Sequence, residues 1–265
     1  MPAIYAHEKF GIMVYQQLPK REQQIISRYP MAFRIGLQGP DFLFFYQLFR
    51  RNKVNRLGKS CHRESIVDFL KRNRKVIEQC GRKGSRYSYL LGYLCHYALD
   101  TTCHPYVAKA METTGCSHSD IEGALDQWLL KRDGFKPEKY PLFELVPKDY
   151  RTAQTVSAFF PELSTQKVEG SLKWLYRVKR LSYAPRIVKR KLLYGILKLT
   201  GFYNNYKGHI MEPRLNPLCK RSSKILYRKM KEAVPVALQL MKDAEELSRG
   251  IVGNHDFERD FYGRE

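Results

Sequence analysis

The strongest constraint on this chain is the largely apolar run 89–107, YLLGYLCHYALDTTCHPYV, in which metal-binding types of side chain recur at every fourth residue. His96, Asp100 and His104 are the three residues concerned. Residues four apart lie on one face of an α-helix, with Cβ atoms about 5–6 Å apart, so a helical run places all three on a single stripe. Because Pro105 disfavours helical backbone at the preceding residue, we expect His104 at the end of this helix.

A second run, SHSDIEGALDQWLL, repeats the spacing with His118 and Glu122. Imidazole and carboxylate groups are ligands that zinc takes in proteins. A single pair of this kind often arises by chance, and the alternative for both runs is a helical bundle with polar, water-filled seams. Such a bundle would bury several imidazoles and carboxylates without ions, which is costly. Two pairs with an aligned third histidine therefore favour a zinc site.

Helical periodicity also dominates the rest of the sequence, and no run alternates between apolar and polar residues as a half-buried strand would. The sequence predicts an all-α fold: a single multi-helix domain over residues 1–250, with the metal cluster between core helices. Residues 251–265 are predicted to form a polar C-terminal tail. The expected helices cover residues 5–18, 21–28, 41–49, 62–80, 85–103, 118–131, 150–160, 166–182, 185–199 and 220–249, with loops at 134–147 and 204–217.

Charge is the outlying feature of the composition. The 265 residues include 47 Lys and Arg against 26 Asp and Glu, which gives a formal net charge of +21. Residues 170–231 alone hold 17 Lys and Arg and a single acid, Glu212. A field of this sign attracts polyanions, whether an anionic membrane, a nucleic acid or a phosphorylated substrate.

Two basic amphipathic helices are expected within residues 165–232. Their apolar positions recur every three residues at Leu172, Leu175, Val178 and Leu181, and every four residues at Val188, Leu192 and Ile196. We expect these apolar stripes to face the core and the basic faces to lie in solvent. Such basic faces could also attract anionic lipid headgroups, at about 1 kcal/mol per cation near the surface.

The sequence shows no signal peptide and no membrane-spanning segment. His7, Glu8 and Lys9 interrupt any apolar run near the start, and the apolar run 89–99 is too short to cross a bilayer. We therefore expect a cytoplasmic protein, peripheral at a membrane at most, whose cysteines are thiols. Four cysteines close to the histidines are expected to pack beside the site rather than bind zinc: Cys61, Cys95, Cys103 and Cys116.

Three further motifs precede the run that carries His96. They are IYAHEKFG with His7, GLQGPDFLFFYQ with Asp41, and CHRESIVDFL with His62. Taken alone, Asp41 would be interpreted as the N-cap of a buried helix. Along the chain, the motifs follow the order His, Gly-Pro-Asp, His, HxxxDxxxHPY and HxxxE. Over residues 1–130, this series resembles the zinc-dependent phospholipase C family, the all-α bacterial type.

The resemblance implies ligands for two zinc ions and for a third. Asp41, His62, His96 and Asp100 would hold one zinc ion, and His104, His118 and Glu122 would hold a second. Asp100 and His7 would contribute to the third, for which secreted members of the family also use an N-terminal Trp. No Trp lies near the start of this chain, so we expect two zinc ions and leave the third open.

The resemblance further implies a phosphodiester hydrolase that acts on a phospholipid, with a zinc-bound hydroxide as the nucleophile. Asp41 is either a zinc ligand or the catalytic base that deprotonates this water. Single-strand nucleases share the fold, but their second pair typically reads HxxxD, whereas His118 and Glu122 form HxxxE. A nuclease-like phosphodiesterase, and a non-catalytic metal-stabilised module that binds membrane or nucleic acid, remain the alternatives.

Asp126 extends the stripe of His118 and Glu122 and is expected to contact a ligand or solvent rather than zinc.

Overall fold

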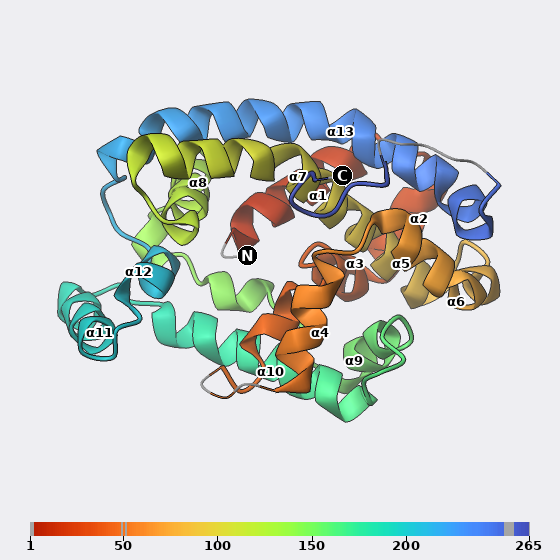
Figure 1. The fold of residues 1–265 in the computed structure, drawn as a ribbon, viewed down its shortest axis with the longest axis horizontal. Coiled ribbons are helices and arrows are strands. Elements are labelled where there is room, and N and C mark those ends of the chain that lie inside the picture. The colour runs from red at the N-terminus through yellow and green to blue at the C-terminus, as the bar shows by residue number, and fades with distance from the viewer. Residues whose placement is uncertain (1–2, 49, 51, 252–256, 265) are drawn as a thin grey trace.

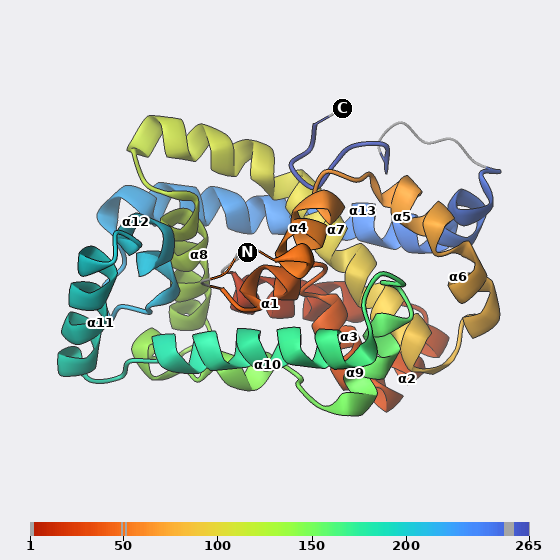
Figure 2. The same ribbon diagram turned by 60° about the horizontal axis from the view of Figure 1, so that its bottom comes forward.

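The computed structural model describes residues 3–48, 50, 52–251 and 257–264, and these residues form thirteen α-helices, five short 3₁₀ helices and no strand. Figures 1 and 2 show the first half of the longest helix, α7 (Gly84–Thr114), surrounded by other helices, whereas its second half runs beside α13 at the edge of the molecule. The all-α prediction is therefore confirmed. The α-helices are α1 (Ile4–Tyr15), α2 (Lys20–Arg28), α3 (Pro30–Gly36), α4 (Lys53–Cys61), α5 (Ile66–Arg72), α6 (Arg74–Cys80), α7 (Gly84–Thr114), α8 (His118–Arg132), α9 (Tyr150–Ser157), α10 (Thr165–Ser182), α11 (Ile187–Leu199), α12 (Tyr203–Tyr206) and α13 (Lys220–Arg249). The 3₁₀ helices are η1 (Asp41–Phe45), η2 (Pro137–Lys139), η3 (Leu142–Leu145), η4 (Lys207–His209) and η5 (Pro217–Cys219).

Helix α7 forms the core of the molecule and is buried on every side from Tyr87 to Asp100. Our prediction that the helix ends near His104 is wrong, because α7 continues through Pro105 to Thr114. Proline inside a helix costs about 3 kcal/mol. Burial of Val107 and Ala110 beyond it favours the continued helix.

The helix predicted over residues 62–80 is instead divided. His62 follows the end of α4, which the sequence analysis missed together with α3. The side chain of Ser65 then accepts a hydrogen bond from the backbone N–H of Asp68 and starts α5. Because this cap satisfies the first turn of a new helix, the chain bends between α4 and α5 and leaves His62 at the bend. In the segment predicted as helix 41–49, residues 41–45 form the short η1 and residues 46–48 form a turn, while residue 49 lies outside the described residues.

Helices α3 and α7 cross so closely that only glycine fits at the crossing. A Cβ on Gly36 would lie 2.3 Å from the carbonyl oxygen of Tyr89, and one on Gly92 would lie 2.2 Å from that of Phe33. The close crossing brings the segment after α3, which carries Asp41, against the face of α7 that carries His96.

The two basic helices differ from each other in how they pack. Helix α10 buries Leu172 and Leu175 as expected, but Val178 is half-buried and Leu181, in the last turn, is exposed. Helix α11 does not follow the prediction, because its buried residue is Arg190, whereas Val188, Leu192 and Ile196 are exposed. Helical periodicity shows that a helix has an apolar face but does not decide which way that face points.

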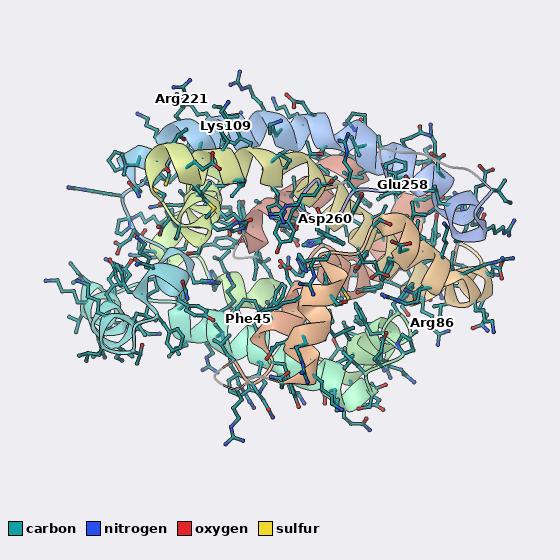
Figure 3. All side chains as sticks on the ribbon, viewed as in Figure 1. Phe45, Arg86, Lys109, Arg221, Glu258 and Asp260 are labelled. Atoms are coloured by element: carbon teal, nitrogen blue, oxygen red, sulfur yellow. The ribbon has the colours of Figure 1, made fainter. Side chains whose placement is uncertain are left out.

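The end of the chain also differs from the expected tail. After α13, residues 257–264 return to the centre of the molecule, where Phe257 and Phe261 are buried. Figure 3 shows Asp260 of this segment near the middle of the view, whereas Lys109 of α7 and Arg221 of α13 project outward. The remainder of the predicted tail, residues 252–256 and 265, lies outside the described residues. No helix in the described ranges is long and apolar enough to cross a bilayer.

Candidate metal centre

The fold brings all eight predicted ligand residues into three neighbouring groups. Within each group, one possible ligand atom from each residue lies within 4.8 Å of the others. The groups are His7, His96 and Asp100; Asp41, His62 and His96; and His104, His118 and Glu122. His96 belongs to two groups, so the first two adjoin each other at α7.

Five elements supply these side chains. Helix α7 contributes His96, Asp100 and His104 from one stripe, as the spacing predicted. His7 comes from α1, Asp41 from η1, His62 from the end of α4, and His118 and Glu122 from the first turns of α8. Seven of the eight are buried, and His118 is partly exposed. His104 of this stripe faces α8, because its Nε2 lies 3.5 Å from Oε1 of Glu122 and it shares a group with His118.

Backbone carbonyls fix the orientation of four buried imidazoles. The Nδ1 atoms of the four rings lie 2.6–3.1 Å from carbonyl oxygens: His7 from Ala3, His62 from Gly58, His96 from Leu37 and His104 from Phe261. A carbonyl oxygen only accepts hydrogen bonds, so each Nδ1 carries the proton. In its neutral form, each ring presents the lone pair of its Nε2 atom to the cluster, which is the arrangement that histidine ligands of metals adopt.

The Nε2 atoms face carboxylate oxygens rather than hydrogen-bond donors. His62 Nε2 lies 2.7 Å from Asp41 Oδ1, and His118 Nε2 lies 3.0 Å from Glu122 Oε1. On α7, His96 Nε2 lies 3.3 Å from Asp100 Oδ2, and neither atom makes a hydrogen bond. A nitrogen lone pair and a carboxylate oxygen are both acceptors, so a positive charge between them is needed for a favourable interaction. This donor set fits zinc, which takes imidazole nitrogen and carboxylate oxygen.

The cluster holds its carboxyl groups in the ionised form that metal binding requires. Burial by itself would raise the pKa of Asp100, but the imidazoles of His104 and His96 hold that pKa well below the usual range. Burial would likewise lower the pKa of His104, yet the negative charge of Asp100, followed by contact with Glu122, raises it to about 9. His96 is different, because burial dominates and lowers its pKa to about 4.

Asp41 reaches the cluster through the tight turn before it. Gly39 adopts a positive φ of 48°, and a Cβ at this position would lie 2.1 Å from Cδ2 of the His96 ring. Glycine therefore lets the chain pass directly over His96 and delivers Asp41 beside His62. Asp41 is the first residue of η1 and not the N-cap of a longer helix, and Phe42 and Phe45 of η1 are buried.

Asp126 has a role that the sequence analysis did not anticipate. It is fully buried, and its carboxylate accepts hydrogen bonds from the backbone N–H groups of Ala6 at 2.7 Å and Tyr5 at 3.2 Å. Our alternatives of a ligand contact or a solvent-facing side chain are therefore wrong. Asp126 instead caps the first turn of α1 from a neighbouring helix, and in this way it positions the helix that carries His7.

The C-terminal segment 257–264 is part of the centre, and the sequence analysis missed it. The carbonyl of Phe261 accepts the hydrogen bond from His104, and its N–H donates to the carbonyl of His62 at 3.2 Å. The ring of Tyr262 stacks on His104, with centroids 5.3 Å apart. The available signal was the four-residue spacing of Phe257 and Phe261 in a polar stretch, which indicates one buried face.

His209 and Lys179 form a buried pair that the sequence did not predict. Lys179 Nζ lies 3.3 Å from Nδ1 of His209, and both side chains are buried. Burial, followed by the charge of Lys179, holds the pKa of His209 well below its usual value. Because an ammonium group only donates, Nδ1 of neutral His209 accepts and the proton lies on Nε2. No local motif marks His209, which adjoins α8 because Gly208 allows close contact with the backbone of Ser119.

A cavity of about 450 Å³ opens beside the centre. It is lined by aromatic rings and by amide, hydroxyl and imidazole groups, among them Phe44, Phe45, Asn204, Asn205, Tyr206, Tyr262, His118 and His209. A larger groove of about 750 Å³ lies between α2 and the start of α7, but none of the eight candidate ligands lines it. The cavity of about 450 Å³ is therefore the one of these two that reaches a candidate ligand, His118.

The four predicted packing cysteines are buried as thiols, and none of them belongs to a candidate ligand group. The all-α fold thus gathers imidazoles and carboxylates into three neighbouring groups that could hold metal ions. The family model for zinc-dependent phospholipase C matches residues 6–177, so the chain belongs to the zinc-dependent phospholipase C family. Searches of curated proteins and of solved structures found no significant match. The family match contains all eight candidate ligands and ends before α11, His209 and the C-terminal segment.

Proposed function

We propose that this protein is a zinc-dependent hydrolase that cleaves a phospholipid-type phosphodiester at the centre around His96 and Asp100. The observation that carries the proposal is the convergence of four histidines, each with Nε2 aimed at a carboxylate, beside a cavity large enough for a headgroup. Membership of the zinc-dependent phospholipase C family supports the same reaction class.

The three groups would together hold two or three zinc ions, and His96, which belongs to two groups but offers one Nε2 lone pair, would bind only one of them. When bound, zinc ions neutralise phosphate oxygens and lower the pKa of water to near 7. Asp100 would hold zinc together with His7 and His96, because its Oδ1 faces His7 and its Oδ2 faces His96. Asp41 is best assigned as a ligand, since its Oδ1 shares a group with both His62 and His96.

His209, which lines the cavity, would bind the substrate. Its Nδ1 accepts from Lys179, so its Nε2–H donates to an oxygen of the phosphodiester. Because burial keeps this ring neutral, the donor stays in place across the physiological pH range. Lys179 acts through His209 by fixing which nitrogen carries the proton.

The experiment is metal analysis combined with hydrolysis of phosphatidylcholine, phosphatidylinositol, a small soluble phosphodiester and single-stranded DNA. We expect zinc in the protein purified without chelators, and hydrolysis of the phospholipids. Preferred cleavage of DNA would favour the nuclease-like alternative, for which the aromatic rings of the cavity could stack bases. Zinc without hydrolysis of any substrate would contradict the proposal and favour a non-catalytic module.

A matched pair of variants ties the activity to the centre. Asp100→Asn removes a ligand, whereas Glu112→Gln removes an exposed carboxylate from the same helix. The first variant should lose both zinc and hydrolysis, and the second should keep both. Equal activity of the two variants would show that hydrolysis comes from elsewhere.

A further inference from the structure

Helix α11 exposes its apolar residues to solvent, which is unusual for a helix of a globular protein. Val188 is 75%, Leu192 62%, Ile196 47% and Leu199 89% exposed. At 100° per residue, these four side chains span less than a quarter of the helix circumference and form one stripe. We name them the α11 stripe. Figures 1 and 2 place α11 at one end of the long axis of the molecule, so the stripe is accessible.

The inner face of α11 is held by polar rather than apolar contacts. Arg190, buried beneath the helix, donates to the carbonyls of Ala184 and Pro185, and its Nε lies 3.4 Å from Glu212 Oε2. The hydroxyl of Tyr194 donates to Glu212 at 2.7 Å. Glu212, the single acid within residues 170–231, therefore contacts two residues of the inner face, and these contacts hold α11 with its apolar side outward.

Cations flank the stripe, and no acid lies on α11. Viewed along the helix axis, Lys189 lies next to one edge of the stripe, and Lys191 and Lys198 lie next to the other edge. Lys191 and Lys198 are exposed. An apolar stripe between lysines is the pattern of helices that lie in the membrane interface, where aliphatic side chains enter the acyl region and the lysines reach anionic headgroups.

We infer that α11 docks the protein on an anionic lipid bilayer by inserting the α11 stripe into the interface. Charge complementarity selects this partner. A second copy of the chain would bring two cationic helices together, and a nucleic acid would leave the apolar stripe in water. The inference deepens the proposed function by naming the surface on which the substrate is met, because α11 leads directly into α12, whose Asn204 and Tyr206 line the cavity.

The first test is flotation of the full-length protein with vesicles of phosphatidylcholine, alone or with about one-third phosphatidylserine. We expect binding to the anionic vesicles that weakens as the salt concentration rises. The triple variant Val188→Ser, Leu192→Ser, Leu199→Ser should weaken this binding by at least about tenfold. The double variant Ile12→Ser, Ile251→Ser removes exposed apolar side chains from other elements and should bind as the wild type does. Equal binding by the triple variant would overturn the inference.

A second measurement reports insertion directly. Leu192→Trp should become quenched by lipids brominated in the upper acyl chain, beyond the signal of the native tryptophans, whereas Ile12→Trp should not. The variant Lys191→Gln, Lys198→Gln should lose about tenfold or more in affinity for the anionic vesicles. Absence of quenching at residue 192 would contradict insertion. A dimer in sedimentation that Leu192→Ser disperses would show that a second copy covers the stripe, and would also overturn the inference.

Hydrolysis of a soluble phosphodiester separates this inference from the proposed function. The triple variant should keep the wild-type rate with that substrate, because the α11 stripe contains none of the candidate ligands. A wild-type protein that hydrolyses the soluble substrate but binds no vesicle refutes docking alone. One that binds vesicles through α11 but hydrolyses nothing refutes the proposed hydrolase alone.

Discussion

Asp100 and Asp126 lie on neighbouring helices but have different roles, one as a candidate metal ligand and the other as a hydrogen-bond acceptor that positions α1. Asp100 faces His7 and His96, whereas Asp126 accepts backbone N–H groups at the start of α1. We expect Asp100→Asn to lower the hydrolysis rate by more than about 100-fold with loss of zinc, because it removes a charged ligand. Asp126→Asn should keep zinc at the groups that lack His7 and lower the free energy of unfolding by about 1–2 kcal/mol. Metal analysis and denaturant unfolding of both variants check this, and a larger loss of zinc in Asp126→Asn would show that the ligands are wrongly assigned.

His209 is the other position where a single side chain can be tested. His209→Gln keeps a hydrogen-bond donor at the cavity wall, whereas His209→Ala removes it. We expect His209→Ala to reduce kcat/KM about tenfold to 100-fold at unchanged zinc content, with partial recovery in His209→Gln. Lys179→Met should have a smaller effect, seen mainly as a changed pH profile. Without Lys179, either nitrogen of the His209 ring can carry the proton, and the ring can also be protonated on both. Loss of zinc in His209→Ala would instead place His209 among the ligands.

At the scale of elements, the C-terminal segment 257–264 orients a histidine that belongs to α7, His104. The helix supplies the ring of His104, but the carbonyl that orients it comes from Phe261, 157 residues later. Deletion of residues 257–265 should weaken zinc binding at the group of His104, His118 and Glu122 by about tenfold to 100-fold while helicity is retained. Zinc titration and circular dichroism measure the two effects. Tyr262→Phe, which keeps the ring that stacks on His104, is the control that should bind zinc normally. Unchanged zinc affinity after the deletion would show that the segment does not support the metal centre.

At the scale of the whole molecule, zinc and protons compete for the same buried groups. The pKa of His104 is raised to about 9, so without zinc its protonated form stabilises the fold below about pH 6.5, and this contribution is lost as the pH rises through 9. Zinc must displace that proton, and its affinity should therefore rise by up to about tenfold per pH unit between pH 6 and 8. Chelation at pH 8 should lower Tm, with several kcal/mol of stability lost if zinc was present at about 1,000 times its Kd. Calorimetry in buffers of different ionisation enthalpy measures the released proton; zinc binding independent of pH would contradict this account.

The sequence by itself determined the helical class, the ligand stripe of α7 and the pairing of His118 with Glu122, because these depend on the fixed geometry of a single helix. The family motifs added His7, Asp41 and His62 as separate fragments. Only the tertiary structure decided that His7 meets Asp100 across 93 residues, and that the end of the chain supports His104. Packing also turned the apolar face of α11 outward, against its predicted direction. Periodicity is a local property of the chain, whereas the partner of each face depends on how all the helices share one core, and that is fixed only when the whole chain folds.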